Sequence, residues 1–246
     1  MIELGPCEIT GVFGPPASGK THFIQSWLQS DFSLTNRCVI FDVTGEYVDD
    51  ENYQHIWSNP RKLARRIMDN QWYFRVAYHC GKNIGEEFEQ IVRVLCHFDC
   101  YKVIVADEFH EICPIYETPD SVQAMLRYAR HAHLAVIAAS QRIADVHKLF
   151  TAACRMVVLF HTEEARDLLA IRDRWGDDCA NAVRELRPLL YNDVTRVTQQ
   201  IPQAIVKTRE CNPLVYDFES NCYLRDVAST DESDIVEIGG EDETSN

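Results

Sequence analysis

One stretch near the beginning of the chain carries the residue types of a phosphate-binding loop. Residues 14–21 read GPPASGKT, which fits the G-x-x-x-x-G-K-[ST] pattern, whose backbone amides surround the phosphates of a nucleoside triphosphate. A β-rich apolar run at 9–13 precedes the motif, and apolar residues at positions 23, 24, 27 and 28 follow it with helical spacing. The motif therefore stands at a strand-to-helix turn, which favours nucleotide binding over a chance match in a Gly/Pro-rich turn.

The residue types in this loop predict separate roles. The glycines permit backbone angles and close approaches that a Cβ would block. The prolines have no N–H, so the amides that face phosphate come from Ala17 onward, where a helix N-terminus favours anions. Lys20 is expected to reach the β- and γ-phosphates, and Thr21 to place its hydroxyl on Mg²⁺. We therefore expect ATP and Mg²⁺ as cofactors, with nucleotide contacts from Gly14, Pro15, Pro16, Ala17, Ser18, Gly19, Lys20, Thr21 and His22.

Two adjacent acids follow another apolar run, at 103–106. Four apolar residues followed by Asp107 form a Walker B pattern, in which the carboxylate holds Mg²⁺ through water. Glu108 comes next and is placed to polarise an attacking water as a general base. We interpret Thr21 and Asp107 as metal ligands and Glu108 as a catalytic residue, in preference to two acids that merely begin a loop.

A neutral amide and three arginines complete the candidate site. Gln141 follows the apolar run at 134–139. Its amide could bond to the γ-phosphate or orient water as a sensor of the nucleotide, or it could simply begin a polar loop, and the residue pattern leaves both open. Arg127, Arg130 and Arg142 are candidates for a guanidinium inserted into a neighbouring subunit's site. The alternative for each arginine is a solvated surface position.

Apolar strands alternate with helical patterns along the chain, which predicts an α/β fold with a mostly parallel sheet and helices on both faces. We expect helices over 119–133 and 145–152, a helix capped by Thr162 and ended by Gly176, and a β-hairpin over 215–224. One domain is expected over 1–225, with its core at 5–175 and further helices and β elements at 176–225. Ligands of such sheets bind outside the carboxyl ends of the strands, where the candidate residues stand.

Acidic residues are concentrated at 226–246, a segment called the acidic tail below. The net charge of the chain is −14, and the tail contributes −8 through eight acids without any Lys or Arg, which leaves −6. The tail is rich in Ser, Thr and Gly, so we expect it to be disordered. Any contact with nucleic acid must therefore come from local basic loops and not from a broad basic face.

The composition indicates a soluble globular protein, with 46% hydrophobic and 25% charged residues. No apolar run approaches the roughly 20 residues that span a bilayer, and a signal-peptide pattern is missing, so we expect a cytoplasmic location. The ten cysteines are scattered and are interpreted as free thiols. The strand after Cys96, His97 and Cys100 separates them from His110 and Cys113 by roughly 20 Å, which argues against a zinc site.

Four segments together resemble the FtsK–HerA superfamily of DNA-pumping P-loop ATPases. They are GPPASGKT at 14–21, CVIFDVTGEY at 38–47, VIVADEFHEI at 103–112 and LRYARHAHLAVIAASQRIADV at 126–146. The most specific feature is a strand that ends in Ser-Gln-Arg after an arginine-bearing helix. The resemblance covers about residues 5–175. It implies a RecA-like ASCE core, a homohexameric ring, ATP sites between subunits, DNA in the pore and a sensor role for Gln141.

The chain lacks the extra domains and membrane segments that many members of this superfamily carry, so it looks most like the genome-packaging ATPases of double-stranded DNA viruses. We expect an ATP-driven translocase of double-stranded DNA, acting in the host cytoplasm or at a virion vertex, with capsid or portal-vertex proteins as further partners. Residues 81–85, with Lys82, and 142–148 are candidate pore loops. The alternatives are a HerA-like or conjugation-type DNA pump of cellular or plasmid origin, a P-loop small-molecule kinase, and a nucleotide-gated scaffold.

Overall fold

The computed structural model of the chain describes residues 8–30, 36–192, 197–209, 211–220 and 222–227. The acidic tail was expected to be disordered, and its residues after Val227 lie outside the described ones. None of the helices in the described ranges combines the length and the apolarity that crossing a bilayer requires. The nine cysteines of the described residues are free thiols.

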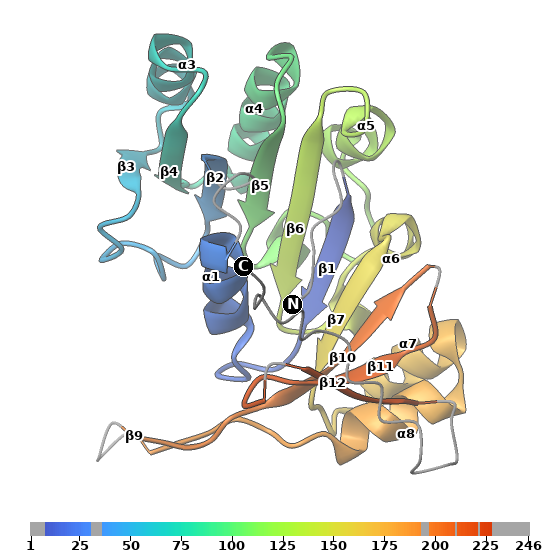
Figure 1. Cartoon of the computed structure of the whole chain (residues 1–246). Coiled ribbons are helices and arrows are strands. Elements are labelled where there is room, and N and C mark those ends of the chain that lie inside the picture. The colour runs from blue at the N-terminus through green and yellow to red at the C-terminus, as the bar shows by residue number, and fades with distance from the viewer. Residues whose placement is uncertain (1–7, 31–35, 193–196, 210, 221, 228–246) are drawn as a thin grey trace, which may run out of the picture.

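A ten-stranded sheet in the order β12-β11-β10-β7-β1-β6-β5-β2-β4-β3 runs through the molecule (Figure 1). The strands from β7 to β3 are mutually parallel, which confirms the predicted parallel sheet. All but the edge strand β3 are mainly apolar and buried, as expected of strands covered on both faces. Their bounds are β7 Met156–Phe160, β1 Ile9–Phe13, β6 Leu134–Ser140, β5 Lys102–Ala106, β2 Arg37–Asp42, β4 Phe74–His79 and β3 Gln54–Trp57.

An antiparallel extension completes one side of this sheet. β10 (Gln203–Thr208) pairs with β7, and β11 (Leu214–Asp217) and β12 (Cys222–Asp226) follow as a hairpin. The hairpin predicted over 215–224 is thereby confirmed. A separate two-stranded ribbon is formed by β8 (Leu190–Asn192) and β9 (Val197–Gln200).

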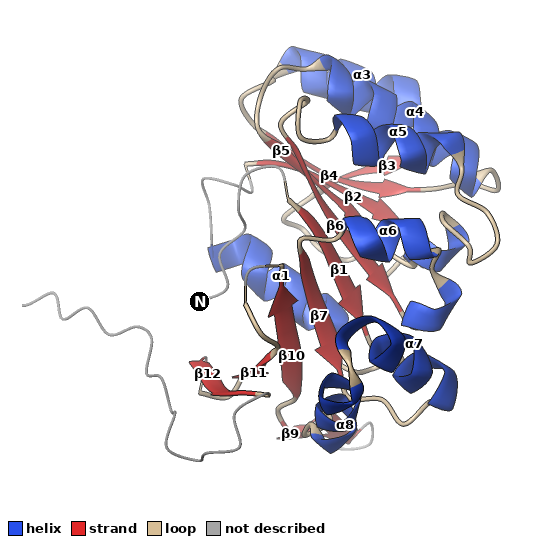
Figure 2. Ribbon diagram, turned by 90° about the vertical axis from the view of Figure 1, so that its right-hand side faces the viewer, coloured by secondary structure: helices blue, strands red, loops and turns tan. Residues whose placement is uncertain are grey.

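Helices cover both faces of the sheet, but unevenly. Figure 2 shows α1 (Lys20–Ser30) on one face and the later helices on the other. Alternate residues of each strand point to opposite faces, so Ile104 joins the core under the second group of helices whereas Val103 and Val105 pack on the α1 side. The second group comprises α3 Pro60–Asp69, α4 Ile84–His97, α5 Asp120–Tyr128, α6 Lys148–Ala153, α7 Ala165–Trp175 and α8 Asp177–Glu185.

The structure corrects two predicted helix boundaries. The helix expected over 119–133 ends at Tyr128, because the chain must turn back into β6 and does so with His133 at φ 52° and a Leu134 N–H to Ala129 O bond of 2.8 Å. The helix expected over 145–152 begins only at Lys148. It is preceded by a 3₁₀ turn at Ile143–Asp145 and by extended backbone at Val146.

The predicted cap of α7 was also wrong in its position. The helix begins at Ala165 with Glu164 as the N-cap residue, so Thr162 lies before the helix. The Thr162 hydroxyl instead accepts the N–H of Glu164 at 3.2 Å, a local side-chain turn. Gly176 ends the helix as predicted, with φ 91°, a backbone angle that glycine adopts without strain.

The topology brings the candidate residues to one edge. The parallel strands all end at the same edge of the sheet, where the loop at 14–21 follows β1, Asp107 follows β5 and Gln141 follows β6. β6 lies between β1 and β5. The strand that carries Gln141 therefore separates the phosphate-loop strand from the strand that carries the two acids.

Candidate nucleotide-binding site

The loop at 14–19 connects β1 to α1, and two of its residues have φ angles in the left-handed region. Ala17 has φ 57° and Gly19 has φ 101°. A Cβ on Gly14 would lie 2.6 Å from Phe160 Cβ and 2.7 Å from Ser18 Oγ, so only glycine fits there. The Ser18 hydroxyl oxygen is buried and has no hydrogen-bond partner among the described residues. A buried polar atom inside a loop of amides is the feature expected of a site built for an anion.

Lys20 is the first residue of α1 and its side chain turns back into the loop. Its Nζ donates to Gly14 O at 2.7 Å and to Pro15 O at 3.0 Å. Burial lowers the pKa of Lys20, while the carboxylates of Glu108, Asp107 and Glu46 act in the opposite direction. The ammonium is therefore held over the loop, where it faces three acids.

Asp107 and Glu108 follow β5 in different environments. Asp107 Oδ2 accepts a 3.0 Å hydrogen bond from Thr44 Oγ1. Burial, reinforced by the nearby carboxylate of Glu46, raises the pKa of Asp107 to about 7. Glu108 has φ 45° and ψ 51°, a left-handed conformation that a non-glycine residue keeps only under constraint from its surroundings. This backbone angle turns the Glu108 side chain toward β6.

Glu108 is held by a hydrogen bond on one carboxylate oxygen and by a close imidazole on the other. Gln141 Nε2 donates to Glu108 Oε1 at 2.6 Å, and His110 Nδ1 lies 3.2 Å from Oε2. Burial alone would raise the pKa of Glu108, but the bonds from His110 and Gln141 lower it below its usual value. The nearby Glu108 carboxylate in turn raises the pKa of His110. Glu108 is therefore held ionised in one orientation.

Glu46 is a further acid at the site, outside the set of residues predicted from the sequence. Its Oε2 accepts the Thr21 hydroxyl at 2.7 Å. The turn that carries Glu46 is held by buried Asp42, whose carboxylate accepts the backbone N–H groups of Gly45, Glu46 and Tyr47 at 2.8, 3.2 and 3.2 Å. In the sequence, an Asp at a strand end followed three residues later by Gly predicts a turn. That pattern could have indicated that Glu46 lies in a turn at the end of the strand.

A cavity of about 380 Å³ contains these groups. The oxygens of Thr21, Glu46 and Asp107 offer the hard ligands that Mg²⁺ prefers, and the buried Asp107 carboxylate lies near that of Glu46. These residues fit a divalent cation. The cavity is lined by Pro16, Ala17, Ser18, Gly19, Lys20, Thr21, His22, Glu46, Asp107, Glu108, Gln141 and Leu189.

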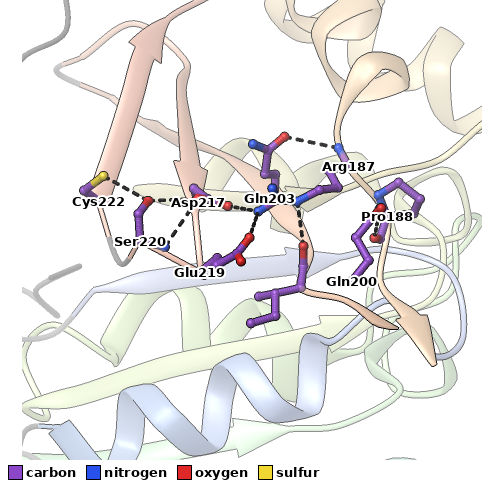
Figure 3. Close-up of polar contacts among 9 residues, drawn as sticks. Arg187, Pro188, Gln200, Gln203, Asp217, Glu219, Ser220 and Cys222 are labelled. Carbon is purple, nitrogen blue, oxygen red and sulfur yellow. Dashed lines mark hydrogen bonds and ion pairs between the residues drawn. The ribbon is translucent and has the colours of Figure 1, made fainter. Parts of the chain in front are cut away.

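The apolar wall of this cavity comes from a distant part of the chain. Arg187, between α8 and β8, bonds to Asp217 and pairs with Glu219 at 3.1 Å (Figure 3). This network ties the segment after α8 to the end of β11. It places Leu189 in the cavity wall and Pro202 against the loop, where a Cβ on Gly19 would lie 3.2 Å from Pro202 Cγ.

The three candidate arginines lie in two places. Arg127 and Arg130 are exposed at the end of α5 and just beyond it, and that end leads into the start of β6, at the opposite edge of the sheet from the cavity. Arg142 is exposed directly after Gln141 and pairs with Glu164 at 3.5 Å. Within one chain, only Arg142 of the three lies beside the site.

The two candidate pore loops differ in how they are anchored. Lys82 is exposed after the end of β4, although Gly81 N–H donates to Glu87 Oε1 at 3.0 Å. The segment 142–148 is packed through buried Ile143 and Val146. The exposed cations of this segment are therefore Arg142 and Lys148, at its two ends.

Comparisons with known proteins bear on the fold. No protein-family model matches the chain, and no curated protein matches its sequence. The genome-packaging NTPase B204 from Sulfolobus turreted icosahedral virus 2, solved with AMPPCP, is similar in structure, with a TM-score of 0.65 and 16% identity over 88% of this chain and 95% of that one.

Two further solved structures are similar. B204 from Sulfolobus turreted icosahedral virus, a DNA-packaging ATPase, has a TM-score of 0.65 and 17% identity over 89% of this chain and 97% of that one. The bacterial conjugative coupling protein TrwB has a TM-score of 0.53 and 10% identity, with 82% of each chain covered. This chain therefore shares the α/β fold of these structures.

Proposed function

We propose that this protein is an ATPase that moves double-stranded DNA and acts as a viral genome-packaging motor. The observation that carries the catalytic part is the Glu108 carboxylate, which is hydrogen-bonded to Gln141, paired with His110 and part of the cavity that Lys20 also lines. Water is the acceptor that such a carboxylate serves, because it can orient and polarise a nucleophile beside the phosphates. The DNA part is supported by the likeness of the fold to a DNA-packaging ATPase and a conjugative coupling protein.

In this proposal each residue has a defined task. The loop amides from Ala17 onward and the Lys20 ammonium bind the β- and γ-phosphates. Thr21, Glu46 and Asp107 hold Mg²⁺, which neutralises phosphate charge when it is bound. Glu108 orients the attacking water, and Gln141 links Glu108 to the segment 142–148. Loss of the γ-phosphate would thus be communicated to a candidate DNA-contacting segment.

A homohexameric ring is part of the proposal. Arg127 and Arg130 are exposed and distant from their own chain's cavity, so any catalytic role of theirs falls on the site of a neighbouring subunit, whereas Arg142 is positioned to respond to its own. We place the ring in the host cytoplasm or at a virion vertex, with capsid or portal-vertex proteins as its docking partners.

The test measures ATP hydrolysis by the full chain with and without linear double-stranded DNA. DNA is expected to stimulate hydrolysis several-fold. Lys20→Ala should abolish hydrolysis and nucleotide binding, whereas Glu108→Gln should lower hydrolysis by about 100-fold or more and still bind ATP. Glu51→Gln, at an exposed position, is the matched control and should behave as the parent.

The outcomes separate the parts of the proposal. Hydrolysis that no DNA stimulates would leave an ATPase but refute the translocase. Hydrolysis unchanged in Glu108→Gln would indicate a nucleotide-gated scaffold or a different base. Phosphate transferred from ATP to a small molecule instead of water would indicate a kinase.

A further inference from the structure

A basic groove of about 690 Å³ lies apart from the nucleotide cavity, between α6 and α7 and over β7 and β10. Figure 2 shows α6 and α7 on the same face of the sheet. Leu169, Ile115 and Val146 contribute apolar walls, and the Leu169 side chain is 47% exposed. The cations that line the groove are Lys148, Arg155, Arg166, Arg174, Lys207 and Arg209.

Part of this positive charge is not paired with an acid in the described part of the chain. Arg155 pairs with Glu8 at 3.2 Å and Arg166 with Asp145 at 3.5 Å. Within the same described ranges, Lys207 and Arg209 bond only to backbone carbonyls, which are neutral.

Two further cations in the groove lack a partner among the described residues. Neither Lys148 nor Arg174 has a side-chain hydrogen bond or an ion pair within the ranges that the structure describes, and burial lowers the pKa of Arg174. The groove is thus lined by six cations and one acid, Asp173, beside apolar walls. This excess of positive charge favours an occupant that is both acidic and apolar.

The acidic tail has this composition. Residues 231–243 read DESDIVEIGGEDE, with seven acids around Ile235, Val236 and Ile238. We propose that this segment docks in the basic groove of its own chain, with its acids on Lys148 and Arg174 and its three aliphatic side chains against Leu169 and Ile115. The docking does not depend on the proposed function.

The point where the described chain ends supports docking within one chain. Val227 packs against the same hydrophobic cluster that contains Val157 and Ile171, so it lies on the face of the sheet that bears the groove. Asp226 pairs with Leu214, which pairs with Val206, so two strand spacings, about 10 Å, separate Asp226 from the strand that carries Lys207. The eight residue spacings between Val227 and Ile235 can span roughly 26 Å, which exceeds this separation.

Zero-length carbodiimide cross-linking of the full chain, mapped by mass spectrometry, tests the docking. The tail contains acids but no lysine, so its cross-links must go to lysines elsewhere. Links from residues 231–243 to Lys148 should exceed links to exposed Lys62 and Lys82 by about 10-fold. Mixing isotopically labelled and unlabelled protein distinguishes links within a chain from links between chains.

A pair of variants makes the test specific. Arg174→Gln should lower the Lys148 links several-fold, whereas Arg184→Gln, on an exposed face of α8 outside the groove, should not. Thermal melting curves confirm that both variants are folded. Replacing Ile235, Val236 and Ile238 together by Ser should also lower the links, since the apolar contacts would be lost.

Three results would overturn the proposal. The first is equal linking of the tail to Lys62, Lys82 and Lys148, and the second is linking only between different chains. The third is tail linking unaffected by Arg174→Gln while that variant weakens binding to a DNA duplex, which would identify the groove as a nucleic-acid site. ATP hydrolysis is measured separately, so failure here leaves the proposed function standing.

Discussion

Gln141 Nε2 and Glu108 Oε1 are joined by a 2.6 Å hydrogen bond between the ends of adjacent strands β6 and β5. The bond couples the residue proposed to sense the nucleotide with the residue proposed to orient water. It also lowers the pKa of Glu108 against the effect of burial. A change at Gln141 should therefore act through Glu108.

Gln141→Glu would place a second carboxylate against Glu108. Like charges at this distance repel each other and raise the pKa of at least one of them, so we expect ATP hydrolysis to fall by about 10-fold or more. ATP affinity should stay within about three-fold, since Gln141 contributes no loop amide. Steady-state hydrolysis and equilibrium binding of a fluorescent ATP analogue measure the two effects. Gln123→Glu, on α5, is the control, and a normal hydrolysis rate in Gln141→Glu would disprove the coupling.

Glu46→Gln tests the acid found through the structure. The amide oxygen can still accept the Thr21 hydroxyl, but one negative charge near the proposed metal is lost. The Mg²⁺ concentration for half-maximal hydrolysis should rise by about 10-fold, with the rate largely restored at saturating Mg²⁺. A magnesium titration of hydrolysis, with Glu51→Gln beside it, provides the measurement. An unchanged magnesium dependence would show that Glu46 serves only to hold the turn.

Asp107 should make the stability of the nucleotide-free, metal-free chain depend on pH. Its pKa in the folded chain is about 7, mainly because it is buried, whereas an unfolded Asp titrates near 3.9. The folded state therefore binds a proton more readily between these values, so the contribution of this group to stability is full below about pH 4 and is lost as the pH rises through 7. Asp107→Asn removes this loss.

Melting temperatures in EDTA measure that effect. At pH 8, Asp107→Asn should melt roughly 5 °C above the parent, and the difference should shrink at pH 5. Asp99→Asn, at an exposed side chain, should show neither effect. Equal melting temperatures of the parent and the variant at pH 8 would indicate that ionisation of Asp107 does not destabilise the folded chain.

Gly14 and Gly85 form a matched pair for alanine substitution. A Cβ on Gly14 would lie 2.6 Å from Phe160 Cβ, which is part of a buried strand, so Gly14→Ala must move the loop. We expect ATP affinity to fall by at least about 10-fold, with a loss of stability of roughly 1–3 kcal/mol.

Gly85 has open space where Gly14 has none. It lies in the first turn of α4, and none of the described atoms comes within 4 Å of the position that a Cβ would take there. Gly85→Ala should therefore leave ATP binding unchanged and stabilise the chain by about 0.5–1 kcal/mol. Binding titrations and thermal melts check both variants, and equal effects would contradict the packing argument.

The sequence alone determined the local features of this protein. It was sufficient to predict the phosphate-loop motif, the strands, and the acids at 107 and 108. Each of these features is defined by residues that lie within a few positions of each other in the chain. The end of α5 and the cap of α7 were misplaced because turns into the next element, and not helix propensity, set those boundaries.

The tertiary structure decided which of these features meet. Gln141 touches Glu108 only because β6 lies beside β5, Glu46 reaches Thr21 because Asp42 folds its turn toward the loop, and Leu189 joins the cavity because Arg187 is tied to β11. The hydrogen bonds from Thr21 to Glu46, from Arg187 to Asp217 and from Gln141 to Glu108 join residues 25, 30 and 33 positions apart in the chain. Strand order and side-chain packing over such separations depend on the whole folded core, and no local pattern of residues encodes them.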